Sequence, residues 1–512
     1  MIANQGRRWG RLAVAFLLPI FVSVESAMAD AGSDSAMAMQ AKLKSAVGEV
    51  WQQTEPIRAR TFIESAALAE EEFTRRWDAV FEPLLDTLDW FEADAFTPRR
   101  DCQVERTRVL CSWGKGRLIY PFMRWRETGQ SVLELSESYD EYLGKIDRKD
   151  ALLLDVDEYR SFLRLYVHEM ARRRLLTDSL YRTGDNRWTR AEYDVCVDSI
   201  PDTTLNREIL YEILSEHIEK YGTKCLAPLI SRFKQAYGEY WQSGKLDSLY
   251  TDERRYWEGF TSEVYKRADG IDLELHMLES DSAVTGIRPA LVWFHGGSWS
   301  EGVWYWGMGL TGALASAGMK VFQVEYRIHD RHLSTPVQSL EDAKSAIRYV
   351  RANASRLGID PNRIMAAGFS AGGTLAVSTA LLDGFEGPGE DTSISSRPTA
   401  VVSVSGCLDP TLDPWFRRIV QPVAPEDLSP LAQVRGGAPP MVLINGTRDE
   451  MCAFGAASEF SERMAAAGNV CELAPLEGRS HFFPVMNRAD RTDALTTIGK
   501  FLANQGVLES GD

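Results

Sequence analysis

The stretch Gly368-Phe369-Ser370-Ala371-Gly372-Gly373 decides how the rest of this chain is interpreted. It contains the pattern Gly-x-Ser-x-Gly, between an apolar run at 363–367 and a segment with good helix-forming residues. A strand, a sharp turn and a helix are the context that this motif requires before its serine can be read as a nucleophile. Gly368 and Gly372 stand where such a strained turn leaves no room for side chains. Ser370 is therefore the candidate nucleophile.

A serine hydroxyl attacks efficiently only when a base removes its proton. In this class of motif the partners follow along the chain in the order serine, acid, histidine. Downstream of Ser370 the chain contains a single histidine, His481, in a loop after the last expected strand. His481 is therefore the predicted general base.

The acid that orients the imidazole should stand in a loop just after a strand. Asp449 does so, because it follows the apolar run 441–445. Glu450 is adjacent and is the alternative acid. Asp409 and Asp413 follow an earlier apolar run and are weaker candidates.

Backbone N–H groups that stabilise an oxyanion are expected in a glycine-rich loop beside the nucleophile. The stretch His295-Gly296-Gly297-Ser298-Trp299 follows the buried apolar run 290–294 and fits this need. The predicted oxyanion donors are the N–H groups of Gly297, Ser298 and Ala371. Three side chains are candidates for contact with a substrate, although the tryptophans could equally serve packing: His295, Trp299 and Trp304.

The length of 512 residues predicts two or three domains, and the character of the sequence changes near residue 255. Residues 30–255 carry helical periodicity and predict a mostly α-helical domain of unknown role, with Gly114-Lys115-Gly116 as one of its interruptions. Residues 256–512 alternate strand and helix signals, which predicts a mostly parallel sheet covered on both faces. Its first element is a hairpin that turns at Asp269-Gly270.

The N-terminus has the features of an export signal. Three arginines within residues 7–11 precede the apolar run 12–24, and Ala27-Met28-Ala29 fits the cleavage rule. We expect residues 1–29 to be a signal peptide and the mature protein to be periplasmic or extracellular. An uncleaved anchor is the alternative, although the apolar run is short for a membrane span.

Charge and cysteine content limit the partners. A net charge of -16 argues against nucleic acid or an anionic membrane as a partner. The seven cysteines show no zinc-site spacing with histidine, and we expect no metal or cofactor. Export would permit disulfides, for which proximity in the sequence suggests Cys102 with Cys111 and Cys196 with Cys225.

Together these landmarks resemble a known family. Residues 256–490 resemble the α/β-hydrolase esterases of the acetyl esterase and hormone-sensitive-lipase-like group, including acetyl-xylan and feruloyl esterase-like members. Two departures concern the site: Ser298 replaces a third glycine, and Cys452-Ala453-Phe454 replaces an apolar Val-Pro pair after the acid. The resemblance rests on the motifs above and on the stretches 325–327, 341–348, 358–364, 446–449 and 477–481.

The resemblance implies an α/β-hydrolase fold and a secreted serine carboxylesterase for short-chain, acetyl esters on a small molecule or a plant polysaccharide. It implies an acyl-enzyme on Ser370. A peptidase of the prolyl-oligopeptidase type is an alternative, although such enzymes carry a β-propeller and this N-terminal half predicts helices. A binding module attached to an inactive hydrolase is the second alternative.

Overall fold

The structure is a computed structural model, and it describes residues 36–130, 135–278, 286–483 and 488–508. The predicted signal segment 1–29 lies outside these residues. The chain divides into two compact units. The first comprises Met1–Arg174 and Asp194–Ile209, and the second comprises Leu175–Tyr193 and Leu210–Asp512.

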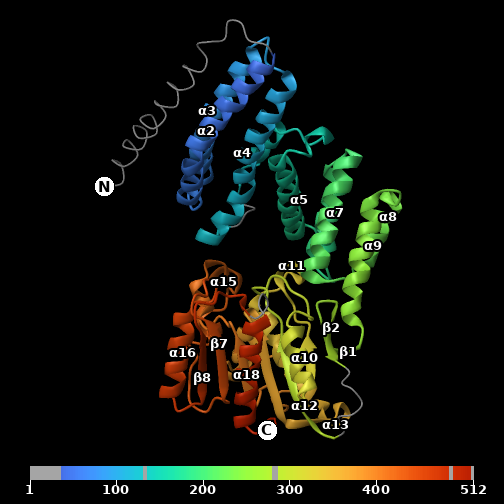
Figure 1. Ribbon diagram of the computed structural model, residues 1–512, viewed down its shortest axis with the longest axis vertical. Helices are drawn as coiled ribbons and strands as arrows, with labels where there is room; N and C mark the ends of the chain where they lie inside the picture. The colour runs from blue at the N-terminus through green and yellow to red at the C-terminus, as the bar shows by residue number, and fades with distance from the viewer. Residues whose placement is uncertain (1–35, 131–134, 279–285, 484–487, 509–512) are drawn as a thin grey trace. The chain divides into compact units, whose positions relative to one another are not determined.

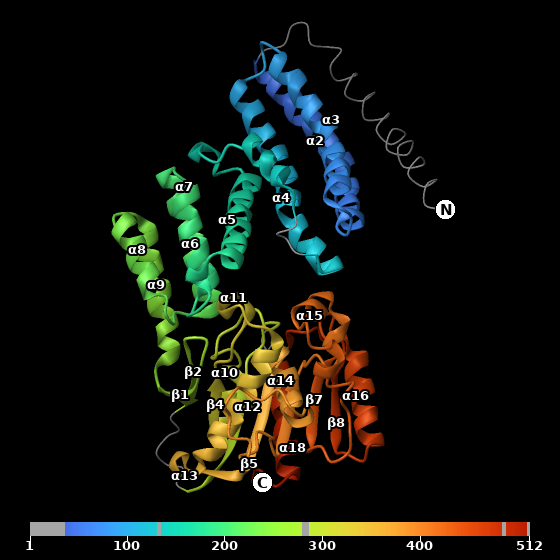
Figure 2. The ribbon, with the colours of Figure 1, turned by 180° about the vertical axis from the view of Figure 1, so that it is seen from behind.

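The first unit is helical, as the sequence predicts. Helices α2, α3 and α4 lie side by side (Figure 1), and the reverse view agrees (Figure 2). Their contact is aromatic: the rings of Phe73 and Tyr120 stack with centroids 3.9 Å apart, and both are fully buried. The helices with residues in this unit are α2 (Ala36–Ser65), α3 (Glu70–Ala93), α4 (Arg99–Thr128), α5 (Asp157–Thr177), α6 (Arg187–Ser199) and α7 (Thr203–Tyr221), of which the last three also have residues in the second unit.

Helix α4 runs unbroken through Gly114-Lys115-Gly116, so the predicted interruption there is wrong. A Cβ atom on Gly116 would lie 2.2 Å from the indole of Trp77, and one on Gly114 would lie 2.5 Å from Ile146. The glycines therefore serve the close approach of neighbouring side chains rather than a turn. Sequence alone does not separate these two uses of glycine.

The second unit is built on one eight-stranded sheet with the order β1-β2-β4-β3-β5-β6-β7-β8. Strands β1, β2 and β4 pair antiparallel and the remaining pairs are parallel, which confirms the predicted, mostly parallel sheet. The predicted hairpin turns at Asp269-Gly270. The strands are β1 (Phe260–Ala268), β2 (Ile271–Leu278), β3 (Arg288–Phe294), β4 (Lys320–Val324), β5 (Ile359–Phe369), β6 (Ala400–Val404), β7 (Met441–Gly446) and β8 (Cys471–Leu476).

Helices cover both faces of this sheet, and the alternation of β3 shows how. Val292 and Phe294 join a core with α12, α14 and α16, whereas Leu291 and Trp293 join a core with α10 and α18. The helices of this unit are α8 (Ala227–Tyr237), α9 (Trp241–Arg254), α10 (Met308–Ser316), α11 (His329–His332), α12 (Pro336–Ala352), α13 (Ala354–Leu357), α14 (Ala371–Leu381), α15 (Pro414–Ile419), α16 (Phe454–Ala466) and α18 (Arg488–Asn504).

Short 3₁₀-helices occur in the connections of both units. They are η2 (Glu137–Lys145), η3 (Ala151–Leu153), η4 (Ser179–Tyr181), η5 (Arg255–Trp257), η6 (Pro410–Leu412) and η7 (Pro425–Leu428).

The second unit begins well before the predicted boundary at residue 255. Buried ion pairs account for this difference. Arg331 of α11 pairs with Asp185 at 2.6 Å, and both side chains are buried. Lys224 pairs with Glu274 of β2 at 2.7 Å. Because such pairs join segments far apart in the sequence, the patterns along the chain do not reveal them.

All seven cysteines are free in the structure, so neither suggested disulfide forms. Cys102 and Cys111 lie on the same helix, α4, whose rise of about 1.5 Å per residue separates them by roughly 13 Å. A disulfide requires Cα atoms within about 7 Å. Cys196 instead contacts the carbonyl of Asn206 at 3.8 Å, and Cys225 is exposed.

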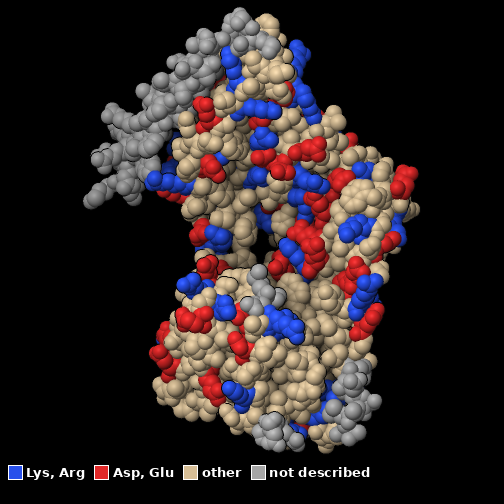
Figure 3. Space-filling model, viewed as in Figure 1, with Lys and Arg blue, Asp and Glu red and all other residues tan. Residues whose placement is uncertain are grey.

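The surface carries charges of both signs. Figure 3 shows Lys and Arg side chains interspersed with Asp and Glu on this face of the molecule. Among the residues that the structure describes, no helix has the length and apolar character needed to cross a membrane.

We predict that Gly116→Ala lowers the free energy of unfolding by about 1–3 kcal/mol, because the added methyl group overlaps the Trp77 ring. Urea unfolding followed by tryptophan fluorescence measures the change. Gly48→Ala is the matched control, since Gly48 lies within α2 and its Cβ would meet no atom within 4 Å. That control should be stabilised by up to about 1 kcal/mol. Equal effects of the two changes would contradict the packing role of Gly116.

Candidate active site

Ser370 occupies a strained turn between β5 and α14. Its backbone angles are φ 55° and ψ -123°, a conformation that costs a non-glycine residue about 1–3 kcal/mol. The Ser370 N–H donates to the carbonyl of Val404 at 2.9 Å, and the Ser370 carbonyl accepts from Thr374 at 3.0 Å. The surrounding sheet and helix thus hold the serine at the N-terminus of α14.

The two predicted elbow glycines are required by close backbone contacts. A Cβ on Gly368 would lie 2.3 Å from the backbone of Gly372. A Cβ on Gly372 would lie 2.0 Å from the carbonyl oxygen of Phe294, at the end of β3. Neither position accepts a side chain while the turn keeps this shape.

The structure brings Ser370, His481 and Asp449 into one hydrogen-bonded chain. His481 Nε2 lies 2.9 Å from Ser370 Oγ, and His481 Nδ1 lies 2.8 Å from Asp449 Oδ2. All three residues are buried. The alternative acid Glu450 is exposed, and Asp409 instead accepts hydrogen bonds from Thr411 and Ser429.

Backbone and side-chain donors fix the acid and the histidine. The second carboxylate oxygen of Asp449 accepts the N–H groups of Met451 at 3.0 Å and Cys452 at 2.7 Å. The Ser405 hydroxyl donates to the carbonyl of His481 at 3.0 Å. Both loops are therefore held by groups that lie at the carboxyl ends of neighbouring strands.

The predicted oxyanion loop passes directly beside the elbow. A Cβ on Gly296 would lie 3.2 Å from Ser370 Cβ. Gly297, Ser298 and Trp299 follow with positive φ angles of 117°, 52° and 58°. This run turns successive backbone groups through a tight curve, and the Gly297 carbonyl accepts the N–H of Ser300 at 2.9 Å. The loop and Ala371 therefore stand near the serine, as the sequence places them.

The side chain of His295 is buried and packs inside the protein under this loop, rather than facing solvent. Its ring stacks on Tyr326 with centroids 4.3 Å apart, and the Tyr326 hydroxyl donates to the His295 carbonyl at 2.7 Å. Its Nδ1 lies 2.7 Å from the carbonyl oxygen of Gly296. Burial lowers the pKa of His295 to about 4, so the ring is neutral near pH 7.

Trp299 and Trp304 are both buried, which favours the packing alternative for these two rings. Trp299 contacts Phe416 with centroids 5.3 Å apart. Trp304 stacks on His276 at 4.2 Å and meets Trp257 edge to face at 5.4 Å. The Trp304 ring therefore belongs to a closed aromatic cluster.

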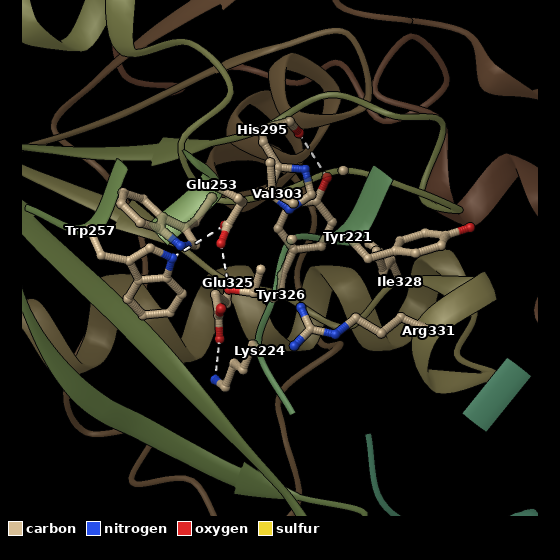
Figure 4. A pocket seen from close by; sticks show the side chains of 14 residues that line it. Tyr221, Lys224, Glu253, Trp257, His295, Val303, Glu325, Tyr326, Ile328 and Arg331 are labelled. Atoms are coloured by element: carbon tan, nitrogen blue, oxygen red, sulfur yellow. Dashed lines mark hydrogen bonds and ion pairs between the residues drawn. The ribbon is translucent and has the colours of Figure 1, made fainter. Parts of the chain in front are cut away.

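A buried charge cluster lies behind His295 and Tyr326. Glu274, His276 and Glu325 place potential metal-ligating atoms within 4.8 Å of one another. Figure 4 shows Glu325 and Lys224 pointing toward each other, and Lys224 also pairs with Glu274 at 2.7 Å. The single ammonium group of Lys224 bridges the two carboxylates, so the cluster forms a buried ion-pair network in this structure.

Comparisons with known proteins agree with this architecture. A family model named BD-FAE matches residues 277–412. Esterase LipC of Mycobacterium tuberculosis is 30% identical over 238 residues, which cover 42% of this chain and 58% of that protein. The probable carboxylic ester hydrolase LipM of the same organism is 28% identical over 260 residues, covering 47% and 59%. The chain thus matches just under three fifths of the length of each of these two relatives.

The second unit is an α/β-hydrolase of the esterase group. Thermogutta terrifontis esterase 2, in its apo form, is a solved structure that is 34% identical to this chain. The alignment covers 50% of this chain and 98% of that one, with a TM-score of 0.47. These similarities concern the hydrolase unit.

Sequence reasoning missed the residues that support the hydrolase site. The Tyr326 hydroxyl donates to the carbonyl of His295 in the oxyanion loop, and the Ser405 hydroxyl donates to the carbonyl of His481. Lys224 forms an ion pair with Glu325. Lys224 stands far from the site in sequence and within the part assigned to another domain. No local pattern marks such residues, because their partners are set by the tertiary fold.

We predict that lowering the pH from 7 to 5 weakens folding partly through His295 and His217. Burial lowers the pKa of His217 to about 3 and that of His295 to about 4, from 6.5 in an unfolded chain. Below pH 6.5 the unfolded chain binds protons that the folded chain does not, so stability falls as the pH falls. Each histidine should contribute a loss of about 2 kcal/mol over this range.

The measurement is the free energy of urea unfolding at pH 7 and at pH 5 for the wild type and His217→Gln. Removing one buried histidine should reduce the difference between the two pH values. His168→Gln, at an exposed position, is the matched control and should leave it unchanged. An unaltered pH difference in His217→Gln would show that its burial does not contribute.

Proposed function

We propose that the hydrolase unit cleaves carboxylic esters through an acyl-enzyme on Ser370. The observation that supports this most directly is the hydrogen-bonded chain from Ser370 through His481 to Asp449, at 2.9 and 2.8 Å. The strained turn presents the hydroxyl, and the backbone of Gly296 passes beside it. Nucleophile, base, orienting acid and oxyanion loop are the four parts that acyl transfer requires.

In the first step His481 Nε2 accepts the proton of Ser370 as the hydroxyl attacks the ester carbonyl. Asp449 holds the Nδ1–H tautomer and stabilises the imidazolium that forms. The N–H groups of Gly297, Ser298 and Ala371 are the proposed donors to the developing oxyanion. His481 then protonates the leaving alcohol. A water molecule next attacks the acyl-enzyme in the same way, with His481 as the base, and the carboxylic acid product leaves.

We further propose that the natural substrate carries a short acyl group, acetyl on a small molecule or a plant polysaccharide. The support is the sequence resemblance to acetyl-xylan and feruloyl esterase-like enzymes, together with the BD-FAE match at residues 277–412.

Replacing Ser370 with alanine should reduce p-nitrophenyl acetate hydrolysis by roughly 10³-fold or more, because no nucleophile remains. Asp449→Asn should also lose activity, through loss of the required histidine tautomer. Ser480→Ala is the matched control: this serine is exposed beside His481 and should keep wild-type rates. Rates are compared on p-nitrophenyl acetate, a long-chain p-nitrophenyl ester, acetylated xylan and a prolyl peptide amide.

Each result on that panel has a distinct meaning. Acetate release from xylan at rates comparable to the model ester would support a sugar alcohol as the natural partner. Cleavage of the peptide alone would replace the esterase with a peptidase. A folded wild type that cleaves nothing, and whose Ser370 resists a fluorophosphonate, would favour the inactive hydrolase with a binding module.

We also propose export through the N-terminal segment, with the mature chain beginning at Asp30. The support is the arginine-containing start, the short apolar run and the Ala-x-Ala ending of residues 27–29. Expression with the native N-terminus in a bacterium should yield a periplasmic or secreted protein whose N-terminal sequence starts at Asp30. A chain retained in the membrane with residues 1–29 attached would support the anchor alternative instead.

A further inference from the structure

Two phenylalanines follow His481 in the chain, and their surroundings differ. Phe483 is 3% exposed and belongs to the core that also contains Ile444 of β7 and Phe501 of α18. Phe482 is 44% exposed. The loop that carries the histidine is therefore anchored by Phe483, and this anchoring does not require the ring of Phe482.

The exposed ring of Phe482 lies against the histidine of the site. The two rings meet edge to face, with centroids 4.9 Å apart. The half-buried ring of Phe369, the residue before the serine, lies 5.2 Å from His481 and 6.2 Å from Phe482. A single exposed apolar side chain is ordinary on a protein surface. Here, however, two phenyl rings and the imidazole form one partly exposed aromatic cluster beside the nucleophile.

The position of this cluster indicates which part of an ester it would meet. A Cβ on Gly296 would lie 2.8 Å from Phe369 Cδ1 and 3.2 Å from Ser370 Cβ, so the cluster reaches from the histidine to the oxyanion loop. The oxyanion loop faces the carbonyl oxygen of a bound ester. The histidine must reach the leaving oxygen to protonate it. Rings packed around His481 therefore lie nearest the alcohol part of the ester.

We propose that Phe482, with Phe369 beside it, contacts the alcohol part of the substrate and makes the site favour esters whose alcohol carries an aromatic ring. This inference rests on the proposed esterase function and deepens it. An exposed apolar ring gains when a substrate removes it from water. Aromatic pairs add a preference of roughly 3- to 10-fold beyond that burial. Phe482 is thus a specificity-determining residue.

The experiment measures kcat and KM of the wild type and of Phe482→Ala on three esters. Phenyl acetate carries its ring in the alcohol. Vinyl acetate has the same acyl group and an activated alcohol without a ring, and vinyl benzoate carries its ring in the acyl group. We expect kcat/KM for phenyl acetate to fall roughly 3- to 10-fold, through a higher KM, while the two vinyl esters change less than about twofold.

Two further variants separate recognition from structure. Phe482→Tyr keeps the ring and should keep the wild-type preference for phenyl acetate. Val470→Ala removes another exposed apolar side chain, which stands before β8 at the edge of the sheet away from the site, and should leave all three rates unchanged. Each variant should melt at the wild-type temperature, because Phe483 still anchors the histidine loop.

The outcomes that contradict the proposal are distinct. Equal losses on all three esters would show that Phe482 positions His481 instead of selecting the alcohol. A loss greater on vinyl benzoate than on phenyl acetate would assign the ring to the acyl part, and unchanged kinetics would remove it from the site. A folded wild type that hydrolyses none of the esters would refute the esterase function itself, whereas an active wild type with any of the other patterns refutes this inference alone.

Discussion

The site of the hydrolase unit depends on the close approach of two backbone segments at the turn that carries Ser370. The Phe294 carbonyl lies so near Gly372 that a Cβ there would sit 2.0 Å from the oxygen. This contact fixes the end of β3 against the start of α14. The oxyanion loop continues from Phe294 and Ser370 begins α14, so a single approach sets the distance between donors and nucleophile.

Burial around that contact leaves the supporting groups in defined ionisation states. His295 stays neutral because it is buried against Tyr326, while Glu325 stays charged because Lys224 and other cations outweigh its burial and hold its pKa low. Breaking such a pair strands a buried charge, which is costly. The Lys224 segment is therefore a structural part of the hydrolase unit rather than an appendage.

The sequence predicted most of the sheet because its strands are apolar runs that alternate with amphipathic helices. It also placed Ser370, His481 and Asp449, which the structure joins in one hydrogen-bonded chain. It erred at Gly114 and Gly116, where glycine serves close packing within a helix. It also erred on the disulfides, because proximity in sequence is not proximity in space along a helix.

By itself the sequence determined the class of fold and the chemical types at the site. Those depend on local periodicity, on backbone freedom at glycine and on the order of residues along the chain. Only the tertiary structure decided between Asp449 and its alternative Glu450 as the partner of His481, and showed that Trp304 packs inward against His276. These outcomes depend on which strand ends become neighbours, a property of long-range packing that no local pattern encodes.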